Sequence, residues 1–360
     1  MRIFEHATIA ISAKEADLRR DVHVQTLRGI ACLLIVAYHV TGTDGTHGVE
    51  IAADHPLAIF NLLLAPVRLP LFTFISGYVY AMRPVRVGGG SQFLFGKARR
   101  LLVPLVVVGG LYFLIQDHVP GTHYFLPLHD VWQIAMFPYQ HLWYLQALML
   151  IFTTTVVLES LRQMENLRSW LLVLAASILI YVSIKFPIDL VAINEALFLL
   201  PFFTLGLGVR RFHETLTTPP LGAVSAFFAL LGIFAYFLMI MRSVAFTELD
   251  QDLLRIVIGM PACVALFCFQ VECFPIAWIG EFSYAIYLFH ILGTAGARIF
   301  LMRCGVTDTS HLIIASFLAG LSLPILIQIF ADRSKVASFL LLGRNPKRAR
   351  VQTSLPILAP

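Results

Sequence analysis

Residues 27–39, LRGIACLLIVAYH, form an apolar segment that opens beside an arginine and closes on a histidine. In an α-helix eleven steps return to nearly the same direction, so Arg28 and His39 share one face, about 16 Å apart along the axis. We expect both side chains to be buried. Ionisable groups on one stripe of a membrane-length helix are costly in lipid, which favours a polar cavity inside the protein. The alternative is that Arg28 snorkels to one interface and His39 marks the other.

The composition of the whole chain is that of a membrane protein. Hydrophobic residues make up 58% of the chain and charged residues 13%, about half the usual charged share of a soluble domain. Basic residues stand at the ends of apolar runs, so the net charge of +5 reflects membrane topology and argues against nucleic-acid binding. The five cysteines predict no disulfide framework, and the twelve scattered histidines predict no metal site.

Ten apolar runs approach the length that a bilayer demands, which predicts an all-α integral membrane protein with a bundle of about ten transmembrane helices. Residues 1–23 form a charged N-terminal tail that lacks the features of a signal peptide. Residues 24–330 form the transmembrane domain, and residues 331–360 form a basic C-terminal tail. The predicted spans are 24–41, 57–82, 101–116, 142–158, 170–184, 190–209, 221–241, 253–271, 276–300 and 312–330.

The distribution of basic residues predicts that both termini are cytoplasmic. With this orientation 19 of the 26 Lys and Arg residues fall in cytoplasmic segments, whereas the external loops hold only Lys185, Arg242 and Arg303. This asymmetry follows the positive-inside rule along the whole chain.

The cytoplasmic connection between the second and third spans is rich in basic residues. Residues 88–90 are three glycines without the lysine and hydroxyl of a phosphate-binding loop, so we interpret them as a linker. The basic residues either anchor the neighbouring spans or bind phosphate groups, because two of them lead directly into the third span. They are Arg83, Arg86, Lys97, Arg99 and Arg100.

Polar residues also occur within the second span, in RLPLFTFISGYVYA at residues 68–81. Arg68 lies near mid-membrane, where an arginine needs a partner or water. Ser76 and Gly77 weaken intrinsic helicity but allow close approach of helices, so packing is their simplest role.

The longest external connection, residues 117–141, contains four histidines, including His141. It forms either an interfacial cap over the bundle or a polar vestibule for a substrate. Trp143 and Tyr144 follow at once and fit an aromatic belt at the interface.

A second histidine-bearing stripe occurs late in the chain, in IGEFSYAIYLFH at residues 279–290. Ser283, Tyr287 and His290 are spaced so that they share one helix face.

Five segments together resemble the acyltransferase 3 family of integral membrane O-acyltransferases, in order and over nearly the whole chain. They are LRGIACLLIVAYH (27–39), PLFTFISGYVYA (70–81), FLFGKARRLLVP (93–104), HLWYL (141–145) and GEFSYAIYLFH (280–290). The resemblance implies a ten-helix bundle in the bacterial inner membrane, surrounded by lipids. It also implies transfer of an acyl group, commonly acetyl or succinyl, from cytoplasmic acyl-CoA to a hydroxyl of a surface or exported carbohydrate or of its lipid-linked precursor.

Carried over position by position, the resemblance makes His39 the essential histidine and Arg28 its partner arginine. Ser76 matches the serine of a Ser-Gly pair, and Arg99 and Arg100 match basic residues before the third helix. Lys97 joins these two as a candidate acyl-CoA-binding residue, with acyl-CoA as a co-substrate and no bound cofactor. Because the chain ends about 30 residues after its last span, we expect it to fall in the family's single-domain group. The further candidates for the cavity are Arg68, Ser76, His141, Trp143, Ser283, Tyr287 and His290.

General acid–base chemistry makes such a transfer plausible. A sugar hydroxyl is a poor nucleophile near neutral pH, and a histidine can remove its proton as it attacks the thioester carbonyl. His39 is either that base or a covalent acyl carrier that relays the group across the membrane. Arg28 holds a donor phosphate or stabilises an oxyanion, while Arg99 and Arg100 bind CoA phosphates.

Two other classes of protein stay open at this point. A transporter or flippase would also place arginines and histidines in a cavity, with helices interrupted at Pro70, Pro104, Pro201 or Pro324. The absence of an internal repeat in the sequence speaks against it. A structural or sensory membrane protein would not need Arg28, Arg68 and His39 at membrane depth. Formation of a homo-oligomer is also open.

Overall fold

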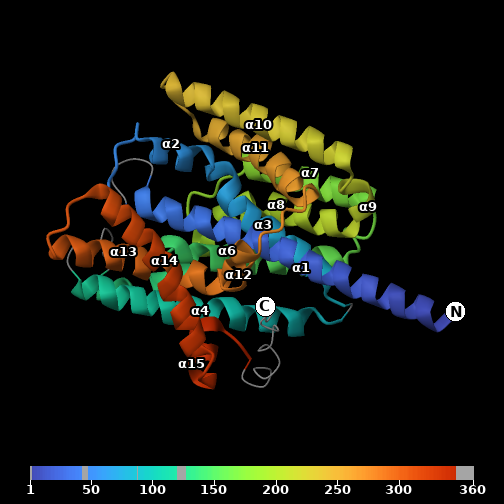
Figure 1. The fold of residues 1–360 in the computed structure, drawn as a ribbon, viewed down its shortest axis with the longest axis horizontal. Helices are drawn as coiled ribbons and strands as arrows, with labels where there is room; N and C mark the ends of the chain where they lie inside the picture. The colour runs from blue at the N-terminus through green and yellow to red at the C-terminus, as the bar shows by residue number, and fades with distance from the viewer. Residues whose placement is uncertain (1, 43–47, 87, 120–126, 346–360) are drawn as a thin grey trace.

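The computed structural model describes residues 2–42, 48–86, 88–119 and 127–345, and for residues 2–21 it describes the backbone only. Every regular element in these ranges is a helix, as the all-α prediction requires (Figure 1). The helices are α1 (Arg2–Thr41), α2 (Pro56–Leu63), α3 (Ala65–Met82), α4 (Gly90–His118), η1 (Leu128–Asp130), α5 (Gln133–Met136), η2 (Gln140–Leu142), α6 (Trp143–Ser160), α7 (Leu167–Ser183), η3 (Leu190–Ala192), α8 (Ile193–Arg211), α9 (His213–Leu216), α10 (Pro219–Met241), α11 (Glu248–Cys268), α12 (Phe274–Glu281), α13 (Ser283–Arg303), α14 (Thr309–Ala331) and α15 (Lys335–Leu342).

Within the described ranges, eight helices are long and apolar enough to cross a membrane, or nine if α2 and α3 together form one span. Helix α7 is also apolar but has only 17 residues. The predicted count of ten spans therefore requires both the bent pair and α7 to cross the bilayer.

The second predicted span, 57–82, is not one straight helix. Helices α2 and α3 meet at Leu64 and are bent by 43°. Pro66 explains the break, because proline lacks the N–H that would donate to Leu62 and its ring crowds that carbonyl. The bend directs α3 into the centre of the molecule.

The ninth predicted span, 276–300, is also divided. Helix α12 ends at Glu281, and α13 begins at Ser283 after the non-helical Phe282. Gly280 lies directly against α1, where a Cβ atom would stand 1.9 Å from the backbone oxygen of Gln25. The close packing of α12 on α1 thus accompanies its separation from α13.

The third span begins earlier than the sequence predicted. Helix α4 starts at Gly90, eleven residues before the expected position at Leu101. Lys97, Arg99 and Arg100 therefore lie on a helix and not in a flexible connection. Only Gly88, at a φ of +80°, and Gly89 remain as a turn before it.

Helix α1 runs through the middle of the bundle and packs against α3, α12, α13 and α14 (Figure 1). We call the end at which α1 and α13 finish the outer end, because the basic residues predict that it faces outward. The opposite end is the inner end. Helix α10 lies at one edge of the bundle, and its exposed Phe227, Phe228 and Phe234 suit contact with lipid.

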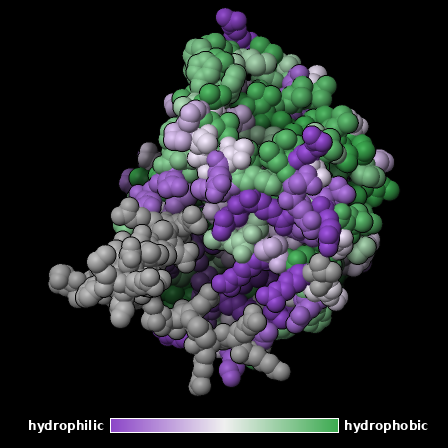
Figure 2. Space-filling view, turned by 90° about the vertical axis from the view of Figure 1, so that its right-hand side faces the viewer, coloured by the Kyte–Doolittle hydropathy of each residue, from purple (hydrophilic) through white to green (hydrophobic). Residues whose placement is uncertain are grey.

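The inner end is seen in Figure 2, which looks at the side from which α1 starts. Hydrophilic side chains gather across the middle of this surface, with hydrophobic side chains above and beside them. Helix α15 lies at this end against α4, within the segment that the sequence assigned to a C-terminal tail.

Candidate active site

A cavity of about 1110 Å³ opens between the helices toward the outer end. Its walls come from α1, α3, α4, η2, α6, α7, α8, α11, α13 and α14, so residues from almost the full length of the chain meet there. The wall residues that matter most for chemistry are Tyr38, His39, Arg68, Tyr112, His141, Trp143, Tyr144, Tyr287 and His290.

Three histidines from three different helices meet in this wall. His39, near the end of α1, has its ring centre 4.7 Å from that of His290 on α13 and 6.3 Å from that of His141 in η2. The rings of His141 and His290 are 4.9 Å apart. His141 and His290 are buried, whereas His39 is partly exposed to the cavity. The structure thus brings together three histidines that the sequence had placed on separate segments.

Backbone carbonyls fix the tautomers of two of these rings. The Nδ1 atom of His290 lies 2.9 Å from the carbonyl oxygen of Ile286, and the Nε2 atom of His141 lies 3.3 Å from that of Leu288. A carbonyl oxygen only accepts, so each of these nitrogens carries the proton, and the other nitrogen of a neutral ring carries a lone pair.

The two remaining nitrogens, Nε2 of His290 and Nδ1 of His141, are buried and have no hydrogen-bond partner within the described part of the chain. Buried polar atoms are normally paired, so such atoms mark a place where a substrate or a proton is received. Both nitrogens can act as proton acceptors beside His39.

Tyrosines hold the histidines in place. Tyr287 donates a hydrogen bond from its hydroxyl to the backbone oxygen of His141, and Tyr112 donates to the oxygen of Leu288 over 3.1 Å. The sequence singled out Tyr287 but not Tyr112, which carries no signal beyond its place in an apolar run. Tyr144 was expected in an interfacial belt; instead it is buried in the cavity wall, with its ring 5.3 Å from that of Tyr287.

Arg68 contacts Tyr38, whose ring centre lies 4.8 Å from that of His39. Its guanidinium carbon lies 3.9 Å from the centre of the Tyr38 ring, next to His39 in the chain. Its Nη1 atom is buried without a hydrogen-bond partner in the described structure. The sequence predicted that Arg68 needs a partner at this depth, and a tyrosine face supplies one. The unpaired Nη1 suits a developing negative charge.

Three of the predicted cavity and catalytic residues lie outside the cavity wall: Arg28, Ser76 and Ser283. Arg28 is partly buried and donates to Gln25 Oε1 over 3.4 Å. It lies eleven residues before His39 on α1, toward the inner end. It interacts electrostatically with Tyr144, which does line the cavity. The sequence predicted that Arg28 and His39 are both buried, but both are only partly buried. His39 lines the cavity, whereas Arg28, on the same face of α1, does not. Ser76 donates to Phe72 in its own helix over 2.9 Å.

The predicted acyl-CoA-binding residues lie near the inner end and also outside the cavity. Lys97 packs its Nζ atom 3.9 Å from the centre of the Phe152 ring. Arg99 donates from Nε to the backbone oxygen of Gly343 over 3.3 Å. The Arg100 guanidinium lies 4.8 Å from the centre of the Tyr284 ring. The three side chains therefore contact three different parts of the fold.

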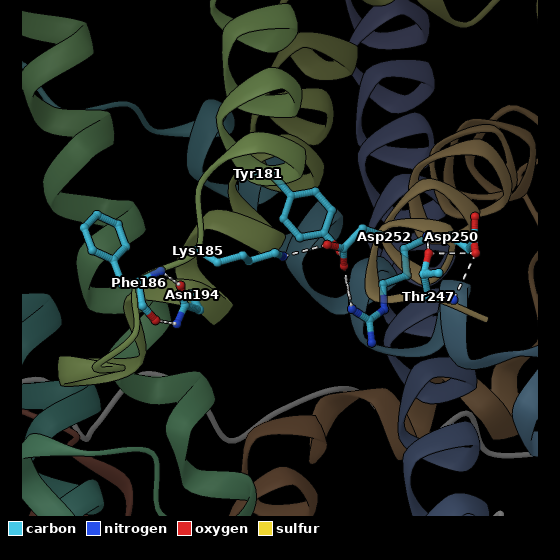
Figure 3. Close-up of polar contacts among 8 residues, drawn as sticks. Tyr181, Lys185, Phe186, Asn194, Thr247, Asp250 and Asp252 are labelled. Atoms are coloured by element: carbon cyan, nitrogen blue, oxygen red, sulfur yellow. Dashed lines mark hydrogen bonds and ion pairs between the residues drawn. The ribbon is translucent and has the colours of Figure 1, made fainter. Parts of the chain in front are cut away.

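A second polar cluster lines the cavity nearer its opening and was missed by sequence reasoning (Figure 3). Asp252 on α11 is buried and pairs with Lys185 over 2.6 Å and with Arg255 over 3.0 Å. Tyr181 at the end of α7 also donates to this carboxylate. The available signal was Arg255 inside the predicted span 253–271, three residues after an Asp at its start, because a charge at that depth needs a partner.

Comparison with known proteins identifies the family of the chain. The sequence profile described as "Acyltransferase domain", of the acyltransferase 3 family, matches residues 22–329. The inner membrane protein YcfT of Escherichia coli (strain K12) is 35% identical over 69 residues, which are 17% of this chain and 19% of that protein. The match thus spans about a fifth of that relative's length. No solved structure matches the chain. The profile covers the histidine cluster and most of the bundle, and the chain therefore belongs to the acyltransferase 3 family of membrane acyltransferases.

Proposed function

We propose that the protein transfers an acyl group, acetyl or succinyl, from cytoplasmic acyl-CoA to a hydroxyl of a surface or exported carbohydrate. The location that fits this role is the bacterial inner membrane, and the relative YcfT is itself named an inner membrane protein. The observation that carries the proposal is the meeting of His39, His141 and His290 in one cavity of about 1110 Å³. Such a cavity can enclose the reacting ends of both substrates.

In the proposed reaction His39 is the general base. The acceptor hydroxyl oxygen attacks the thioester carbonyl carbon, so that a C–O bond forms and the C–S bond breaks. The hydroxyl proton passes to His39 and then to the departing CoA thiolate. The lone pairs on His290 Nε2 and His141 Nδ1 support His39 by accepting hydrogen bonds or a proton.

Arg68 is the proposed stabiliser of the tetrahedral oxyanion. Its guanidinium is held over Tyr38 and keeps a buried donor without a protein partner. A donor that is in place before the reaction stabilises charge as it develops, without reorganisation. The sequence assigned this role to Arg28 as one alternative, but Arg68 lines the cavity and Arg28 does not, which favours Arg68.

The donor is proposed to bind from the inner end. Lys97, Arg99 and Arg100 supply positive charge there, and arginine binds phosphate groups through paired N–H donors. Arg28 precedes His39 on α1 by eleven residues toward the inner end, and Tyr144 lines the cavity, so both are proposed to face the bound CoA thioester.

The test is acyl transfer by the His39→Ala protein in inverted membrane vesicles. A base contributes about 10²-fold or more to turnover, so His39→Ala should lose at least that much while it folds normally. His311→Ala is the matched control, since His311 is an exposed histidine at the outer end that does not line the cavity. Labelled acyl-CoA is supplied to inverted vesicles, and label is measured in glycan at matched thermal stability.

Two outcomes would contradict the proposal. Near wild-type turnover in His39→Ala would remove His39 from the chemistry. Label that accumulates in the vesicle lumen without entering glycan would favour a transporter or flippase, whose helices can also be interrupted beside a polar site.

A further inference from the structure

The outer lobe of the cavity, which we define by Tyr181, Lys185, Glu195, Phe198 and Arg255, takes no part in the proposed chemistry. Its residues come from the end of α7, the connection after it, the first turns of α8 and the second turn of α11. These ends all belong to the outer end of the bundle, away from the residues proposed to bind the donor.

A single buried carboxylate organises this lobe (Figure 3). Asp252 is 3% exposed and receives hydrogen bonds from Lys185 Nζ over 2.6 Å and Arg255 Nη1 over 3.0 Å, as well as from Tyr181. Each cation also lies over an aromatic ring. Lys185 Nζ is 4.5 Å from the centre of the Tyr181 ring, and Arg255 Cζ is 5.0 Å from the centre of the Phe198 ring. The two cationic heads are thereby held in fixed positions.

The backbone that carries Lys185 is also fixed. Asn194 makes two hydrogen bonds to the neighbouring residue Phe186, one to its N–H and one to its carbonyl oxygen, both of 2.9 Å. This pair fastens the connection between α7 and α8 onto the start of α8 (Figure 3). A site that is rigid before binding loses less entropy when a ligand arrives.

The lobe offers both donors and an acceptor. An ammonium has three N–H donors and a guanidinium five, and Asp252 occupies one of each. Glu195 supplies an acceptor, since its Oε2 atom is buried without a hydrogen-bond partner in the described structure. A hydroxyl both donates and accepts, so a row of hydroxyls can satisfy both kinds of group, whereas a fully ionised anion has no proton to donate to Glu195 Oε2 and would compete with Asp252 for the two cations.

We propose that the outer lobe binds hydroxyl-bearing sugar units of the acceptor, with Lys185, Arg255 and Glu195 as the residues that determine acceptor specificity. This inference rests on the proposed function, which supplies a carbohydrate acceptor. It assigns the acceptor to the outer lobe and leaves the donor to the inner end.

The test measures binding of the acceptor without any donor. The probe is a set of fluorescently labelled oligosaccharides prepared by mild hydrolysis of the surface polysaccharide of the producing cells, freed of ester groups by alkali. Arg255→Gln and Glu195→Gln should each raise the dissociation constant by about tenfold, the usual effect of losing one hydrogen bond to a charged group. The Michaelis constant for acyl-CoA should not change in either variant.

Arg242→Gln is the control, because Arg242 is an exposed arginine that follows α10 at the outer end and does not line the cavity. Wild-type affinity for the oligosaccharides in both lobe variants would overturn the inference. A second result would also overturn it: inorganic pyrophosphate displaces the oligosaccharides from the wild type but not from Arg255→Gln. That result would show that the lobe is an anion site. Failure of the proposed function has a different signature: the wild type would bind the oligosaccharides and transfer no acyl group.

Discussion

The three histidines of the cavity differ in what the surrounding residues allow them to do. His141 and His290 each donate one N–H to a carbonyl of α13, so their protonated nitrogens are fixed and their free nitrogens face the cavity wall. His39 is the one of the three with partial exposure to the cavity. It is therefore the ring that can contact a substrate, and the other two are suited to position it or exchange a proton with it.

We predict that His290→Phe lowers turnover by about tenfold or more, because phenylalanine fills the ring's volume but has no lone pair with which to assist His39. Thermal stability should change little, since the lost hydrogen bond runs to carbonyls that also belong to the α13 helix. The measurement is kcat with acyl-CoA in excess. An unchanged kcat would assign His290 to packing alone.

At the scale of helices, close approach of α3 and α8 holds the centre of the bundle together. Gly77 and Gly206 lie at this crossing, and a Cβ atom on Gly206 would stand 1.9 Å from the backbone oxygen of Phe74. Small residues permit such contacts between membrane helices. Helix α3 also carries Arg68, so this crossing helps to position the side chain that we propose as the oxyanion stabiliser.

Gly206→Ala should therefore destabilise the protein by about 1–3 kcal/mol, the range seen for overpacked interiors, because a backbone carbonyl cannot turn aside. Gly110→Ala in α4 is the matched control: it has open space around the new methyl group and should be neutral or slightly stabilising. The midpoint of thermal unfolding in detergent would be compared for the two variants. Equal midpoints would show that α3 and α8 can separate without cost.

The sequence predicted the helices better than their breaks. Apolar runs fixed where helices lie, because the bilayer demands length and hydrophobicity. Pro66 could have signalled the bend between α2 and α3, whereas the separation of α12 from α13 depends on Gly280 contacting α1, which no local pattern reveals. The start of α4 was placed late because Lys97 and its basic neighbours looked like a loop.

The candidate site was predicted residue by residue but not as an assembly. His39, His141 and His290 were each noticed, yet helix periodicity says which face a residue occupies and not which helix packs against it. Ser283 shares the spacing of Tyr287 and His290 but lies nearer the inner end, below the cavity. The Asp252 cluster escaped notice because its members are scattered over about 75 residues and meet only through tertiary packing.

At the scale of the whole molecule, the two ends of the bundle carry different chemistry. The inner end holds Lys97, Arg99 and Arg100 and a broad hydrophilic surface (Figure 2), whereas the cavity with its histidines opens toward the outer end. A transfer between substrates on opposite sides of a membrane needs such a division. The orientation of the bundle thus decides which side supplies which substrate.

A reporter inserted at residues 88–90 should accordingly read cytoplasmic, and one in the connection between α10 and α11 should read external. The reason is that 19 of the 26 Lys and Arg residues lie in the segments predicted to be cytoplasmic. Fusions of alkaline phosphatase and a fluorescent protein at each position would give the answer. A cytoplasmic reading at both positions would contradict the predicted orientation and move the cavity opening to the other side.

The arrangement of the outer lobe bears on how related enzymes could diverge. The residues that we propose to bind sugar come from the segment 181–198 and from the start of α11. The three histidines come from α1, η2 and α13. Asp252 and Asn194 fasten the lobe through contacts that involve none of the histidines. Exchange of these segments between relatives can therefore alter the range of glycans that are modified while the transfer chemistry is inherited intact, which makes the outer lobe the natural place to graft a new acceptor preference.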